Sequence, residues 1–211
     1  MIFNFSNNYQ FTTRLKLCDE TLEIVNKTKL LGVIMTDDLK WDENVIYLVK
    51  KAWQKMEILR KAASFGASKD EKREIYILYV RSTLEQSCVI WGSRLTTENK
   101  IDLERVQKAA VRIILNKSYE SYNEALIKAN LETLDKRREK LYLNFAKKST
   151  QNDKTDKFFP IKKNKHKMTK RKNEKFIVNY ARTERLKTSS IPHMQRLLNR
   201  NHQEYQIKFH Y

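Results

Sequence analysis

The most informative stretch of the sequence is residues 45–59, which read VIYLVKKAWQKMEIL. Apolar residues recur in it at intervals of three and four, the spacing that places them on one side of an α-helix. These apolar positions are Val45, Leu48, Val49, Ala52, Trp53, Met56 and Leu59. The pattern therefore predicts an amphipathic helix whose apolar side faces a core.

Further helices are predicted along the chain from helix-start signals and from the same periodicity. Ser68 with Glu71, and Ser121 with Glu124, have the spacing of a capping box, in which side chains and backbone N–H groups satisfy one another. The segment after Ser68 is apolar on nearly every side, so we expect it to form the central helix. Ile75, Leu78, Tyr79 and Ser82 follow the helical period along it, with Tyr76, Val80 and Leu84 on the adjoining face. The remaining helices are marked by Thr96 or Thr97 and by Leu134, Arg138, Leu141, Tyr142 and Phe145.

The start of the chain is strand-like. Residues 11–17 and 23–25 are short runs in which apolar and polar residues roughly alternate. Residues 29–35 form an apolar run with a single glycine, which is typical of a buried strand. Asp37 and Asp38 then provide turn and helix-start chemistry.

The composition excludes several classes of protein. The 211 residues include 3 Gly and 2 Pro, where average usage would give roughly 25 of the two together. β-Sandwiches, β-barrels and glycine-rich phosphate loops need many more such residues. The spacing of Cys18, Cys88 and the four histidines indicates neither a disulfide framework nor a metal site, and we expect no cofactor. Without a membrane span or a signal peptide in the sequence, we expect a nuclear or cytoplasmic protein.

The net charge of +18 is concentrated toward the C-terminus. Residues 150–211 hold 16 Lys and Arg against 5 Asp and Glu, a net charge of +11. This excess predicts a polyanionic partner, RNA or DNA, and not a small-molecule substrate. The densest basic run, which could be an RNA-binding arm or a nuclear-import signal, consists of Lys162, Lys163, Lys165, Lys167, Lys170, Arg171 and Lys172.

Basic residues also gather on the predicted helices. Arg105, Lys108 and Arg112 are three and four residues apart, so one helix face carries all three. Such a stripe can follow a phosphate backbone, or it can be a solvated face balanced by nearby acidic residues. The other helical candidates for nucleic-acid binding are Lys50, Lys51, Lys55, Arg137 and Arg138. Candidates for base stacking are Tyr119, Tyr122, Phe158 and Phe159, whereas Trp41, Trp53 and Trp91 are expected to pack in the core.

Four ordered blocks carry a family resemblance. Residues 31–34 and 38–41 read LGVI and DLKW, and residues 75–91 begin with IYILYVRS and end with VIW. Residues 103–114 read LERVQKAAVRII, and residues 131–138 read LETLDKRR. The blocks resemble the end of the palm and the thumb of reverse transcriptases from non-LTR (LINE-type) retrotransposons, with Gln86 where that family usually has an aromatic residue. The motif positions expected to be structural are Leu31, Gly32, Val33, Trp41, Tyr76, Arg81, Trp91 and Gln107.

The resemblance implies a mainly α-helical fold, in which a thumb-like bundle is preceded by a short β-hairpin or strand remnant and followed by a basic, partly disordered tail. It divides the chain into remnant palm strands at residues 1–36, a thumb-like domain at 37–149 and a basic arm at 150–211, with a short helix near 191–199. Because a polymerase thumb grips template and primer, the implied function is to hold RNA, DNA or their hybrid by the backbone.

The polymerase centre of that family is not found in this sequence. The centre consists of a Tyr/Phe-x-Asp-Asp turn and a further Asp, which hold two metal ions, and it precedes the first block found here. Asp37 and Asp38 follow Met35 and Thr36, not an aromatic residue, so we expect them to form a turn. We therefore expect no enzymatic activity from this chain alone. The alternatives are a part of a longer RNA-directed DNA polymerase, a self-associating or partner-binding helical module, and a decayed remnant without function.

Overall fold

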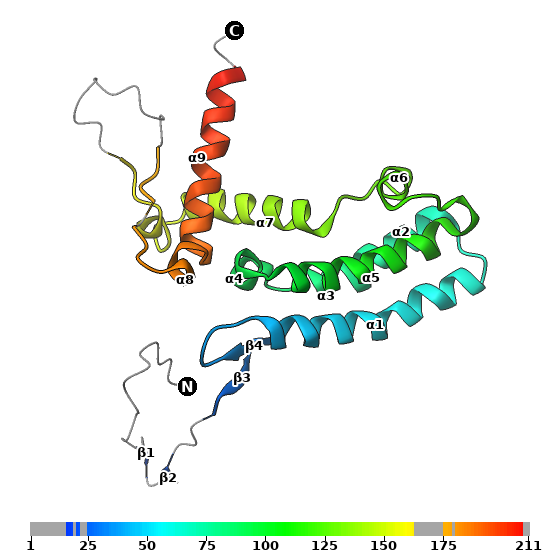
Figure 1. Cartoon of the computed structure of the whole chain (residues 1–211), viewed down its shortest axis with the longest axis horizontal. Helices are drawn as coiled ribbons and strands as arrows, with labels where there is room; N and C mark the ends of the chain where they lie inside the picture. Colours follow the sequence, from blue (N-terminus) through cyan, green and yellow to red (C-terminus); the bar gives the residue numbers. More distant parts are fainter. Residues whose placement is uncertain (1–15, 19, 22–24, 163–174, 179, 209–211) are drawn as a thin grey trace.

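A computed structural model describes residues 16–18, 20–21, 25–162, 175–178 and 180–208. Over these residues the protein is mainly α-helical, with two small antiparallel β-ladders before the first helix, which confirms the predicted fold class (Figure 1). The two short strands predicted at residues 11–17 and 23–25 lie mostly outside the described residues. Their described part includes β1 (Lys16–Leu17), which pairs with β2 (Glu20–Thr21).

The apolar run at residues 29–35 belongs to a β-hairpin and is not the single buried strand that we predicted. β3 (Lys27–Leu30) pairs antiparallel with β4 (Val33–Thr36). The two residues between the strands, Leu31 and Gly32, have φ angles of 47° and 84°, and a tight type I′ turn needs positive φ at both positions. The glycine therefore marks a turn, and Leu31 at its tip is 91% exposed.

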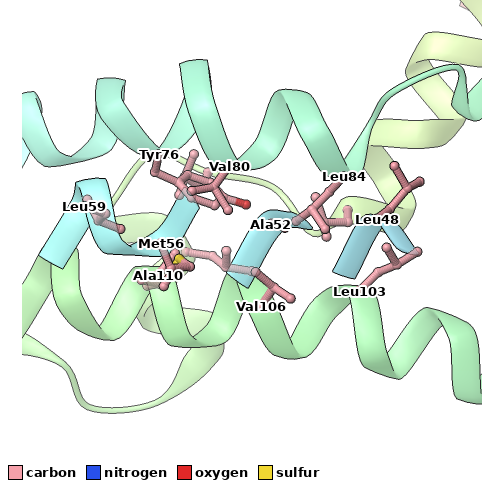
Figure 2. Packing of buried hydrophobic residues seen from close by; sticks show 14 of the residues in the cluster. Leu48, Ala52, Met56, Leu59, Tyr76, Val80, Leu84, Leu103, Val106 and Ala110 are labelled. Carbon is pink, nitrogen blue, oxygen red and sulfur yellow. The ribbon is translucent and has the colours of Figure 1, made fainter. Parts of the chain in front are cut away.

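Three helical segments form the main core. They are α1 (Asp42–Ser64), the run of α2 (Lys69–Ile75), η1 (Tyr76–Arg81) and α3 (Ser82–Leu84), and α5 (Thr97–Leu115). Figure 2 shows that α1 and α5 run in the same direction and that the α2–α3 run is antiparallel to both. The fully buried side chains between them include Leu48, Ala52, Met56, Val80, Leu84, Leu103, Val106 and Ala110. The helix predicted from residues 45–59 is thus one wall of the core.

The α2–α3 run buries one of its two adjoining apolar faces and exposes much of the other. Tyr76, Val80 and Leu84 are buried, whereas Leu78 is 64% exposed and Tyr79 is also exposed. Residues Tyr76–Arg81 form a π-helix, in which each turn holds more residues than an α-turn. This segment, apolar on nearly every side in the sequence, therefore has one buried face and one that is partly exposed.

The predicted helix starts are observed. Ser68 and Glu71 form a complete capping box at α2, and the Thr96 hydroxyl accepts the Asn99 N–H at the start of α5. α6 (Tyr122–Lys128) begins after Ser121, whose hydroxyl accepts the Glu124 N–H. α7 (Leu134–Ser149) is capped by Thr133 in the same way. Local side-chain chemistry therefore sets the beginnings of these helices.

A second hydrophobic cluster lies where α9 (Ser190–Lys208) crosses α7 (Figure 1). α9 is longer than the short helix predicted near residues 191–199, and α8 (Glu184–Lys187) precedes it. The buried members of the cluster come from both sides of residue 149, so the described part of the C-terminal segment shares a core with α7. They are Tyr142, Ala146, Phe159, Phe176, Met194, Leu197 and Leu198.

Candidate nucleic-acid interface

The exposed side of α5 carries three cations in a row. The helix buries Leu103, Val106, Ala110 and Ile114 in the core, and this leaves the intervening positions at the surface. Arg105, Lys108 and Arg112 are all exposed, one turn apart on one face, and we call them the α5 cationic face. The structure therefore brings these three predicted residues together.

Two tyrosines lie beside the α5 cationic face. The Lys108 ammonium is 5.1 Å from the ring centroid of Tyr122, and the Arg112 guanidinium carbon is 5.3 Å from that of Tyr119. Cation–π contacts of this kind orient long basic side chains without neutralising them. Arg105 instead forms an ion pair with Asp102 at 2.8 Å, an exposed contact of small energy.

A hollow of about 320 Å³ opens between α1 and α5, beside the same cations. Trp53, Ile101 and Ala109 provide its apolar lining, and the α5 cationic face provides the rest. We call it the α1–α5 hollow. Trp53 is half-buried and packs against the main core, so its ring is held in place by its neighbours.

Behind this surface lies a buried polar network centred on Gln107. Its side-chain oxygen accepts a 2.5 Å hydrogen bond from the Tyr76 hydroxyl, and its amide nitrogen donates to the Tyr122 hydroxyl and the Glu132 carbonyl at 2.9 Å each. Glu104 accepts from the Tyr122 hydroxyl and, at 3.0 Å, from the Leu134 N–H. The network joins η1, α5, α6 and α7, and it fixes the Tyr122 ring next to Lys108. The family resemblance marked Tyr76 and Gln107 as structural positions but did not indicate that they meet.

Burial in this network changes the acidity of both tyrosines. Desolvation raises the pKa of Tyr76 well above its usual value. Desolvation also raises the pKa of Tyr122, and its hydrogen bond to the Glu104 carboxylate raises it further. Both hydroxyls therefore stay protonated over the whole neutral range and act as hydrogen-bond donors.

The three predicted lysines of α1 do not form one cluster. Lys50 precedes Trp53 by three residues, so it lies on the flank of α1 that borders the hollow. Lys51 is on the other flank, because two residues correspond to a rotation of about 200° around a helix. There its ammonium is 5.8 Å from the ring of Tyr47, whose hydroxyl accepts a 2.8 Å hydrogen bond from Lys29. Lys55 shares the flank of Lys51, being four residues further on.

On this second flank, two lysines lower the pKa of a tyrosine. The hydrogen bond from Lys29 lowers the pKa of Tyr47, although slight desolvation opposes it, and the nearby charge of Lys51 adds to the effect. The ammonium groups of both lysines are thus engaged with one ring. The flank is separate from the α5 cationic face.

Arg138 belongs to the interior of the fold and not to a binding surface, which corrects its assignment, whereas Arg137 is partly exposed and forms an ion pair with Glu85. Arg138 is 3% exposed, because it continues the buried stripe of Leu134 and Tyr142 along α7. Arg137 donates from Nε to Glu85 at 2.9 Å and from an Nη nitrogen to the same carboxylate. A charge count along the sequence could not distinguish these two arginines from the exposed cations of α5.

Of the basic run predicted at residues 162–172, the structure describes only Lys162. Lys162 is exposed, and its backbone N–H donates to the Lys175 carbonyl at 2.9 Å. The stacking candidate Phe159 is buried in the second cluster, which removes it from the surface, whereas Phe158 is exposed beside Lys157. The other predicted tail residues lie outside the described residues: Lys163, Lys165, Lys167, Lys170, Arg171 and Lys172.

Most of the motif positions of the four blocks occupy buried or constrained places. A Cβ atom on Gly32 would lie 2.5 Å from Nε2 of Gln86, so the hairpin turn packs directly on that side chain. The Trp91 indole N–H donates to the Gln86 carbonyl at 2.9 Å. Arg81 forms an ion pair with Glu85 at 3.8 Å. Val33, Trp41, Tyr76, Trp91 and Gln107 are buried, and Leu31 is exposed at the turn.

Asp37 and Asp38 form a turn between β4 and α1. The Asp38 carboxylate accepts hydrogen bonds from the Thr36 hydroxyl at 2.7 Å and from the Lys40 N–H at 3.0 Å. Although partial desolvation raises the pKa of Asp38, these hydrogen bonds outweigh it and lower the pKa to about 2.

Across the described part of the chain, no group of three His, Cys, Asp or Glu side chains is arranged to hold a metal ion. None of the described helices has the length and apolarity to cross a membrane.

Compared with known protein families, curated proteins and solved structures, the chain matches none of them. The surface chemistry of α1, α5 and α6 is therefore the basis for assigning a function.

Proposed function

We propose that the protein binds nucleic acid through the α5 cationic face. The observation that carries this proposal is the row formed by Arg105, Lys108 and Arg112, exposed on one face of a rigid helix and flanked by two tyrosine rings. Three cations one turn apart match the repeated charges of a phosphate backbone, and each contact releases counterions. Lys50, on the neighbouring flank of α1, would extend the same track.

Binding of this kind reads charge and shape, not base sequence. Lysine and arginine contacts to phosphates position the ligand and carry no sequence information. The basic residues near the C-terminus, where residues 150–211 carry a net charge of +11, would add long-range attraction. We place this activity in the nucleus or the cytoplasm, where RNA and DNA are available.

The test is a salt titration with a charge-matched control. In the variant Arg105→Gln/Lys108→Gln/Arg112→Gln, we expect weaker binding of labelled RNA and DNA. Its plot of log K against log salt should be flatter than that of the unaltered protein by about 2 to 3, because each lost phosphate contact removes roughly 0.7 to 0.9 from the slope. The control, Lys61→Gln/Lys148→Gln/Lys154→Gln, removes the same charge from exposed positions elsewhere. Equal slopes for the two variants, or no salt dependence in the unaltered protein, would overturn the proposal.

We further propose that the chain derives from the C-terminal part of a non-LTR reverse transcriptase. The support is the sequence resemblance, together with the burial of Tyr76, Trp91 and Gln107 from two of its blocks. In that case the thumb-like helices serve a longer RNA-directed DNA polymerase whose catalytic palm is encoded upstream. Translating the genomic sequence upstream of the Met1 codon tests this origin. A Tyr/Phe-x-Asp-Asp motif in frame is the expected result, and an unrelated upstream sequence would contradict it.

A further inference from the structure

We infer that the α1–α5 hollow receives an unpaired nucleobase, so that the preferred ligand is single-stranded. This inference rests on the proposed function and specifies the form of nucleic acid that the same surface takes. It is carried by the juxtaposition of an apolar hollow at Trp53 with the three cations of α5.

The hollow has the size and lining for a flat ring. Its volume of about 320 Å³ equals roughly ten water molecules at their share of the liquid, which is ample for one base. The half-buried Trp53 ring, Ile101 and Ala109 offer apolar surface, and an aromatic side chain can stack on any base. A purely apolar ligand would bring no negative charge to the α5 cationic face.

The charge around the hollow favours a nucleotide over a purely apolar ligand. A nucleotide joins a flat ring to a phosphate, which is the combination that an apolar floor with cations beside it complements. In a duplex the bases are paired and stacked inside the helix, so they cannot enter a hollow on a protein surface. A single strand offers both an unpaired base and a phosphate.

A second copy of the chain is the competing occupant, and the charges oppose it. Two copies meeting at this surface would bring Arg105, Lys108 and Arg112 of one against the same residues of the other. Like charges juxtaposed in an interface cost binding energy unless acidic groups intervene. Asp102 already pairs with Arg105 within one copy.

The test uses intrinsic tryptophan fluorescence, because the three tryptophans differ in access. Trp41 and Trp91 are 7% and 0% exposed, whereas Trp53 lines the hollow. The probes are a single-stranded oligothymidylate of 20 nucleotides, a deoxyribose-phosphate strand of the same length without bases, and a duplex. We expect quenching by oligothymidylate alone, and an affinity for it about 5- to 100-fold higher than for the abasic strand.

The variant Ala109→Leu fills the hollow while it retains Trp53 and all three cations. We expect it to lose the quenching and to bind oligothymidylate only as tightly as the abasic strand, with the salt dependence unchanged. Leu is a strong helix former, and the unaltered circular dichroism of the variant serves as the folding control. Trp53→Phe, which keeps a ring in the hollow, should remove the signal while most of the preference for bases remains.

The outcomes separate this inference from the proposed function. Equal, salt-dependent affinity for the abasic and base-bearing strands would overturn the inference and leave backbone binding intact. If the unaltered protein bound none of the three probes, both the inference and the proposed function would be overturned. Concentration-dependent dimers in light scattering that disappear in Ala109→Leu would overturn the inference in favour of a second copy.

Discussion

At the scale of single residues, Gln107 joins several elements through its buried side chain. It accepts from one tyrosine hydroxyl and donates to another, and it also donates to the carbonyl that precedes Thr133, the cap of α7. An amide has two donors and two acceptor sites, so few other side chains could serve all of these partners. The position of Tyr122 beside Lys108 therefore depends on a residue that no ligand touches.

Replacing Gln107 with Leu should destabilise the fold by about 2 to 4 kcal/mol, because the buried hydroxyls of Tyr76 and Tyr122 would lose a partner. Urea unfolding measures the change. The control is Gln54→Leu, at an exposed position of α1, for which we expect less than about 0.5 kcal/mol. Similar losses in the two variants would show that the network contributes little to stability.

At the scale of secondary-structure elements, the β3–β4 hairpin is fixed by its turn and by α1. Asn44, at the start of α1, accepts the Ile34 N–H at 3.0 Å through its side-chain oxygen. The turn itself requires positive φ at Gly32 and packs on Gln86 of the loop after α3. The hairpin is thus tied to α1 and to the loop after α3.

Gly32→Ala and Gly66→Ala form a matched pair of tests for this element. Both glycines have positive φ, 84° and 79°, so each substitution should cost about 1 kcal/mol of backbone strain. A Cβ at Gly66 has no neighbour within 4 Å, whereas at Gly32 it meets the end of the Gln86 side chain. We therefore expect Gly32→Ala to be the more destabilising in urea unfolding, and Gln86→Ala in the same chain to remove the difference. Equal costs would mean that the turn does not press on Gln86.

Local chemistry explains which elements the sequence could predict. Helix periodicity and the caps at Ser68, Thr96 and Ser121 act within a few residues, and those helices lie where they were expected. No local pattern indicated the π-helical turns of η1, and Arg138 was assigned to the surface by its charge although it lies on the periodic stripe of α7. For the candidate site, spacing identified the α5 cationic face. The tyrosines beside it and the hollow between α1 and α5 depend on packing.

At the scale of the whole molecule, α7 connects the two hydrophobic clusters. Its Tyr142 hydroxyl accepts the Ser93 N–H at 2.7 Å and donates to the Cys88 carbonyl at 2.8 Å, which attaches α7 to the short helix α4 (Cys88–Trp91). The Tyr142 ring also meets the His193 ring of α9 edge to face, with centroids 4.9 Å apart. The C-terminal helix therefore packs against the bundle through a titratable residue.

Stability should fall as the pH drops below about 6.5, the usual pKa of histidine. Burial lowers the pKa of His193, and the charges of Arg196, Arg200 and Lys100 lower it further, with Asp135 opposing them. The unfolded chain then binds a proton at a higher pH than the folded chain, so protonation favours unfolding. His193→Phe keeps a ring against Tyr142, and it should flatten the change in urea midpoint between pH 7.5 and 5.5. An unchanged slope in His193→Phe would contradict the assignment.

The parallel packing of α1 against α5 also governs when the bundle can form during synthesis. Leu48 meets Leu103 in the finished core, so α1 leaves the ribosome before its principal partner has been translated (Figure 2). At 5 to 20 residues per second, this interval lasts roughly 3 to 10 seconds. Over that time the apolar side of α1 has only the hairpin and the α2–α3 run to cover it, and it is available to a nascent-chain chaperone.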